Sequence, residues 1–61
     1  MTVQERLVKA RGNRTRTEVA AAVGVSTSTI TMYETGQRVP RDNIKVRLAD
    51  FYGTSVQALF F

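Results

Sequence analysis

The 61-residue sequence contains no cysteine and no histidine. Without cysteine the chain has no disulfide and no thiolate metal site, which is compatible with a reducing compartment. Without histidine it lacks the usual general base and the usual zinc ligand. These absences argue against catalysis and metal binding, so we expect neither an enzyme nor a cofactor.

Long apolar segments are absent as well. The longest run, residues 19–23, is far too short to cross a bilayer or to serve as a secretion signal. We therefore expect a soluble, cytoplasmic protein with no membrane partner. A chain of this length has room for one small core, so we expect a single domain over residues 1–61.

The basic residues are concentrated in two clusters, although the net charge of the whole chain is only +4. Residues 1–16 carry five cations and one acid, and residues 38–47 carry four cations and one acid. The segment between them holds only Glu18 and Glu34. Two cationic clusters around a nearly uncharged middle are typical of a protein that grips a polyanion, although a generically basic surface would have the same composition.

Capping residues and glycines divide the chain into short helices. The T-x-x-E sequences at residues 2–5 and 15–18 have the spacing of a capping box, in which the hydroxyl and the carboxylate each accept a free backbone N–H. Apolar residues recur at helical spacing after both boxes. Gly12 is expected to end the first helix in the left-handed conformation, and Gly24 is expected to end the second.

Three further helices follow from the same signals. Ser26 is placed to cap a helix over residues 27–35, which Gly36 would end. After a short loop a helix is expected over residues 42–52, and a last short helix follows Ser55. Sustained strand-like alternation occurs nowhere. The sequence therefore predicts an all-α fold, a compact five-helix bundle.

The second and third predicted helices are joined by only three residues, Gly24-Val25-Ser26. A turn this short that contains glycine sets two helices at a steep angle and leaves the second free to enter a groove of DNA. We therefore predict a helix-turn-helix over about residues 16–35, with Ala20 small enough for close helix approach and Val25 packed beneath the turn.

On a helical wheel, one side of the third helix is apolar and the other is made of short hydroxyls. Ile30 and Tyr33 fall on the apolar side. The opposite side holds Thr27, Ser28, Thr31 and Thr35. Ser and Thr are mediocre helix formers but can contact several base edges, which favours base contacts by Thr27, Ser28 and Thr31. The alternative is an indifferent, solvated helix face.

Polar and cationic residues around this helix are candidates for contacts to DNA phosphates. Arg16 starts the second helix, and Thr35 ends the third. Gln37, Arg38 and Arg41 follow in the loop and at the start of the next helix, where side chains and backbone N–H groups can bind phosphates. For any single arginine the alternative is ordinary surface charge, such as Arg38 pairing with a nearby acid.

Ordered segments along nearly the whole chain resemble the phage Cro and repressor family of helix-turn-helix regulators, often called the Xre family. The matching segments are Arg6-Leu7, Thr15-Arg16-Thr17-Glu18-Val19-Ala20, Val23-Gly24-Val25-Ser26, Thr29-Ile30, Tyr33-Glu34, Gly36, Arg38, Pro40, Leu48-Ala49, Gly53-Thr54-Ser55-Val56 and Leu59-Phe60. The resemblance implies a repressor-like five-helix bundle that binds operator DNA, usually as a symmetric dimer, and controls transcription.

The resemblance also implies roles for single residues. The family's DNA-contact positions match Arg16 and residues 37–41 for phosphates, and Thr27, Ser28 and Thr31 for bases. It further implies that Glu34 pairs with an arginine of the first helix, for which Arg11 is the candidate. Many members have Gln or Arg where Thr27 stands, so an arginine contact to guanine is not available from that position.

The chain ends in Phe60 and Phe61, of which one ring is expected to remain exposed. Spare apolar surface on a short helical tail suggests self-association, so we predict a homodimer that is weak alone and completed on DNA. A two-fold dimer would place its recognition helices roughly 34 Å apart, one DNA turn. The alternative is that Phe60 belongs to the core and Phe61 is a frayed end.

These patterns predict a sequence-specific transcriptional regulator, a repressor or Cro-like protein of phage or mobile-element origin, whose partner is double-stranded operator DNA. One alternative is an antitoxin-like or other protein-interaction module with the same fold, served by the Phe60-Phe61 tail. A sequence-neutral nucleoid binder is another. An enzyme is the least supported, because Glu18 and Glu34 already have capping or pairing explanations.

Overall fold

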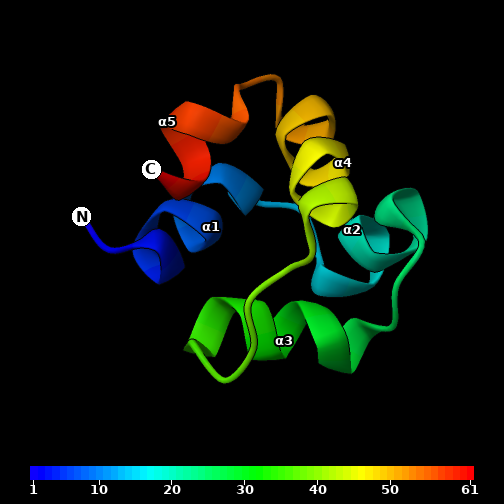
Figure 1. The fold of residues 1–61 in the computed structure, drawn as a ribbon. Helices are drawn as coiled ribbons and strands as arrows, with labels where there is room; N and C mark the ends of the chain where they lie inside the picture. The colour runs from blue at the N-terminus through cyan, green and yellow to red at the C-terminus, as the bar shows by residue number, and fades with distance from the viewer.

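Five α-helices joined by short turns form the structure, a computed structural model that describes all 61 residues (Figure 1). They are α1 (Val3–Arg11), α2 (Arg16–Val23), α3 (Thr27–Thr35), α4 (Asp42–Tyr52) and α5 (Val56–Phe60). No strand is present, so the predicted all-α, five-helix fold is confirmed. No helix has the length and apolar character that crossing a bilayer requires.

Four of the five helices begin with a side-chain cap, as the sequence predicts. In each case a hydroxyl accepts the backbone N–H three residues further on, at 3.0–3.1 Å, and the caps are Thr2, Thr15, Ser26 and Ser55. At α1 the box is complete, because Glu5 accepts the Thr2 N–H at 3.0 Å, and these contacts lower the pKa of Glu5. The prediction of a complete capping box at the start of α2 is wrong. Glu18 makes no return bond to the Thr15 N–H, so only the Thr15 half of the box forms.

The turn after α1 also differs from its prediction. Gly12 has φ 58° and ψ −126°, so it is not in the left-handed helical conformation. This backbone geometry, which residues with a Cβ disfavour, allows the Arg14 N–H to donate to the Arg11 carbonyl at 3.1 Å. The chain therefore reverses tightly, and only a few residues are needed between α1 and α2.

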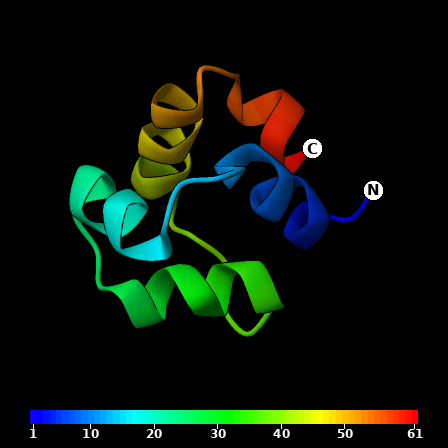
Figure 2. The ribbon, with the colours of Figure 1, turned by 180° about the vertical axis from the view of Figure 1, so that it is seen from behind.

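The helix α3 runs along one edge of the molecule, and the other four helices lie on one side of it (Figures 1 and 2). It contacts α1 and α2, while α4 packs against α2 and α5, and α5 packs against α1. Both views agree that no helix covers the outer side of α3. This arrangement leaves a whole face of α3 available to a partner.

The core takes apolar side chains from all five helices. Its members are Leu7, Val19, Ala20, Val23, Ile30, Tyr33, Ile44, Leu48, Ala49, Leu59 and Phe60. At the C-terminus Phe60 is buried while Phe61 is 71 % exposed, so one ring does remain exposed. Phe51 and Tyr52 of α4 are only half-buried, and the Arg14 guanidinium lies 5.2 Å from the centre of the Phe51 ring.

Candidate nucleic-acid interface

The turn between α2 and α3 is held by backbone hydrogen bonds to one carbonyl. Gly24 has φ 86° and ψ 33°, a left-handed conformation that brings its N–H and that of Val25 to the Ala20 carbonyl, at 2.8 and 3.0 Å. Ser26 then caps α3 directly. Ala20 is 3 % exposed and Val25 packs against the core, as predicted. The helix-turn-helix is therefore built from local bonds and two small apolar contacts.

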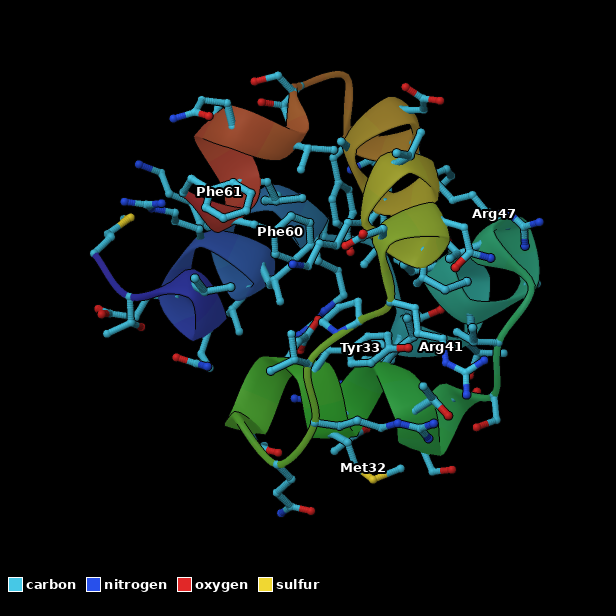
Figure 3. All side chains as sticks on the ribbon, in the orientation of Figure 1. Met32, Tyr33, Arg41, Arg47, Phe60 and Phe61 are labelled. Atoms are coloured by element: carbon cyan, nitrogen blue, oxygen red, sulfur yellow. The ribbon has the colours of Figure 1, made fainter.

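The two sides of α3 differ as the helical wheel predicts. Ile30 and Tyr33 are 2 % and 6 % exposed and fix the helix to the core. On the other side Thr27, Ser28 and Thr35 are exposed and Thr31 is half-buried. The side chain of Met32 also points away from the body of the domain, beside these hydroxyls (Figure 3). The outer side of α3 thus combines hydroxyl, methyl and thioether groups, and it carries no charge.

A buried carboxylate joins α3 to the start of α2. Glu34, whose side chain is 2 % exposed, accepts from Arg11 Nε at 2.8 Å and from Arg16 Nε at 3.0 Å. The expected Arg11–Glu34 pair is present, and this hydrogen bond raises the pKa of Arg11. The second pair was not predicted. Because Arg16 uses only Nε in it, its terminal nitrogens are left free at the N-terminal end of α2.

A surface pocket of about 370 Å³ opens beside the first turn of α3. Its polar lining comprises Arg38, Arg41, Tyr33, Ser26 and Thr29, and it includes no acidic side chain. Neither arginine forms an ion pair, so the alternative of Arg38 pairing with a local acid is wrong. Two free guanidinium groups next to a helix N-terminus make this pocket attractive to an anion.

The hydroxyl of Tyr33 adds a donor to this pocket. The residue is 6 % exposed, its hydroxyl forms no hydrogen bond within the protein, and no fully buried polar atom lacks a partner. The hydroxyl must therefore be the part of Tyr33 that meets solvent, and Figure 3 shows it directed toward Arg41. The apolar pattern of the sequence predicts only that Tyr33 is a core residue. Such a pattern places whole residues, so it does not show that the hydroxyl end of a buried tyrosine reaches the surface.

The residues predicted to bind DNA fall into three groups in space, and Arg16 lies apart from them. Thr27, Ser28 and Thr31 lie on the outer side of α3, with the unpredicted Met32 among them. Arg38 and Arg41 meet at the first turn of α3, because the loop after α3 runs back along it (Figure 1). Thr35 and Gln37 lie exposed at the other end of α3. Arg16 is outside the pocket and is held by Glu34 instead.

A short glycine turn between two helices, a bare outer side on the second helix and flanking arginines are the features of a helix-turn-helix protein, a class of DNA-binding protein. The sequence model of the helix-turn-helix domain family matches residues 5–59, so this chain belongs to that family. Comparison with curated proteins and with solved structures found no match.

Proposed function

We propose that this protein is a sequence-specific transcriptional regulator of the Cro and repressor (Xre) type, of the kind carried by phages and mobile elements. It inserts α3 into the major groove of operator DNA. The observation that carries the proposal is the outer side of α3, which is bare, uncharged and bordered by arginines that have free donors. In this arrangement Thr27, Ser28 and Thr31 contact base edges.

Phosphate contacts would hold α3 in the groove from both sides. Arg16, kept in place by Glu34, contacts a phosphate at the start of α2. Arg38, Arg41 and the Tyr33 hydroxyl contact a second at the pocket beside α3. Thr35 and Gln37 reach the backbone from the C-terminal end of α3. Charge-assisted bonds of this kind set the position on DNA, while the bases give specificity.

Dimerisation on DNA agrees with the size and the surface of the domain. The Cα trace measures 24 × 23 × 21 Å, so two copies fit side by side with recognition helices roughly 34 Å apart, one DNA turn. Phe61 and Val39 are 71 % and 73 % exposed and supply apolar surface for a weak contact. We propose a homodimer that forms fully only on a near-palindromic site.

Selection of binding sites from random duplex DNA tests this function. The expected result is a near-palindrome with half-sites one turn apart, and a wild-type affinity far above that for random competitor DNA. Phe61→Ser should weaken binding to the two-half-site DNA while leaving binding to a single half-site unchanged. Enrichment of no sequence would overturn the regulator proposal and would favour the sequence-neutral nucleoid binder or, with a co-purifying protein, the interaction module.

A further inference from the structure

Three of the four hydroxyls on the outer side of α3 use their protons inside the protein, and the fourth, Ser28, lies 3.1 Å from Ser26 Oγ in a contact that either oxygen can donate. Thr31 Oγ1 donates to the Thr27 carbonyl at 3.3 Å, and Thr35 Oγ1 donates to the Thr31 carbonyl at 2.9 Å. Thr27 Oγ1 donates to Thr17 Oγ1 at 3.4 Å. A hydroxyl has a single proton, so each of these groups presents only lone pairs to an outside partner. In this structure the three threonines on the outer side of α3 therefore act as hydrogen-bond acceptors toward a partner.

Apolar groups fill the rest of this surface. Each threonine on it carries a methyl group, and the Met32 side chain projects from the middle of it (Figure 3). The sequence of α3, TSTITMYET, contains no Arg, Lys, Asn or Gln. The bidentate contacts that recognise guanine or adenine from such side chains are therefore not available within the helix.

Acceptors and methyl groups together match one kind of base pair. In the major groove an A·T pair presents the adenine N6 amino donor and the thymine C5 methyl. A G·C pair also presents an amino donor, cytosine N4, but it has no methyl, so the methyl contacts are what favour A·T. We propose that α3 selects A·T pairs, with the Thr31 methyl and Met32 packed on a thymine methyl and the Thr31 oxygen accepting from adenine N6. This inference rests on the proposed function and specifies which base pairs the half-site should contain opposite the middle of α3.

Replacement of thymine by deoxyuridine in the selected site tests the methyl contact, because it removes only the methyl group. The consensus should have A·T pairs where the middle of α3 meets the half-site. Deoxyuridine there should weaken wild-type binding about fourfold, as expected for one buried methyl-sized group. Replacing that adenine by purine, which lacks the N6 amino group, should weaken binding about fivefold. Replacement by 7-deazaadenine, which keeps the amino group, is the control.

Two substitutions at Thr31 distinguish the contribution of its methyl group to binding from that of its hydroxyl. Thr31→Val keeps a methyl and loses the oxygen, so it should retain the deoxyuridine effect and lose the purine effect. Thr31→Ser keeps the oxygen and loses the methyl, so it should retain the purine effect and reduce the deoxyuridine effect, of which the Met32 contact preserves a part. Thr31 is only half-buried, so both variants should fold.

The outcomes distinguish this inference from the function on which it rests. Two outcomes would overturn the A·T preference while leaving the regulator proposal intact. One is a selected site with G·C pairs opposite the middle of α3, and the other is a wild-type affinity that does not change when thymine is replaced by deoxyuridine. Failure to enrich any sequence would overturn both.

Discussion

Glu34 is a buried carboxylate that connects the stability of the fold with the proposed phosphate contact of Arg16. Its two arginine partners come from α1 and from the first residue of α2, so the carboxylate ties three helices together. It also holds Arg16 where a phosphate would pass. Removing Glu34 leaves Arg11 and Arg16, whose side chains are 19 % and 39 % exposed, without an acidic partner in a partly buried site, which is more damaging than the loss of a surface ion pair.

Glu34→Gln should therefore lower the free energy of unfolding by roughly 2 kcal/mol, a value reduced from fully buried pairs because Arg16 is 39 % exposed. The measurement is urea denaturation followed by circular dichroism. Glu18→Gln is the matched control, since the Glu18 side chain is exposed and makes no side-chain bond, and it should change stability by less than about 0.5 kcal/mol. Equal losses in the two variants would contradict the proposed role of Glu34.

Tyr52 gives a pH dependence whose sign follows from its surroundings. Burial, and then the nearby negative charge of Glu34, raise the pKa of its hydroxyl above 10.0. The unfolded chain therefore loses this proton at lower pH than the folded chain does. The contribution to stability is complete below about pH 10 and is lost as the pH rises through the folded pKa.

Between pH 9 and 11 (about one unit on each side of the unfolded pKa), the free energy of unfolding should fall more steeply in the wild type than in Tyr52→Phe. Urea denaturation at several pH values measures both slopes, and the other titrating groups are common to the two proteins. Parallel curves would show that Tyr52 titrates alike in the folded and unfolded chains.

At the scale of the elements, the turn between α2 and α3 sets the angle between these two helices. Gly24 allows two N–H groups to reach the Ala20 carbonyl only because its φ is positive. A Cβ at this position would also lie 3.4 Å from Arg47 Nη1, which itself donates to the Val23 carbonyl at the end of α2. A side chain at position 24 would therefore strain the backbone, because φ is positive there, but it would meet Arg47 only at an ordinary contact distance.

Gly24→Ala should lower the free energy of unfolding by about 1–2 kcal/mol, the usual penalty for a side chain in the left-handed region. Gly24→Asn should lose less, because asparagine adopts this region more readily although it is the larger residue. Thermal unfolding of both variants makes the comparison. If asparagine proved the more damaging, crowding against Arg47 would outweigh backbone strain.

The elements were the most predictable part of this protein. Caps and helix ends depend on residues within about four positions of each other, and so they can be recognised along the chain. The two errors, at Glu18 and Gly12, concern the detailed geometry of ends that were correctly placed. Of the candidate site, the outer side of α3 followed from helical periodicity, whereas Met32 was missed because methionine is usually a core residue.

For the whole molecule, the proposed function makes the arginines without ion-pair partners the expected contributors to affinity for DNA. Release of counterions makes binding fall with salt in proportion to the number of phosphates contacted. Arg38 is a cleaner probe of this effect than Arg16, since it has no ion pair whose loss would also disturb the fold.

Arg38→Ala should reduce the slope of log K against log salt concentration by about one and weaken binding to all sequences alike. Lys9→Ala, which removes the same charge from the exposed side of α1, should leave the slope nearly unchanged. Fluorescence anisotropy over a range of salt concentrations measures both. A slope for Arg38→Ala equal to that of the wild type would remove Arg38 from the interface.

The amino-acid sequence alone determined where helices begin and end and which side of α3 is bare, because both depend on neighbours one to four positions apart. Only the tertiary structure decided that Arg16 shares Glu34 with Arg11, and that Tyr33 and Arg41 line one pocket. These contacts join residues from different elements. Their distances depend on how the helices pack around a common core, which no local pattern specifies.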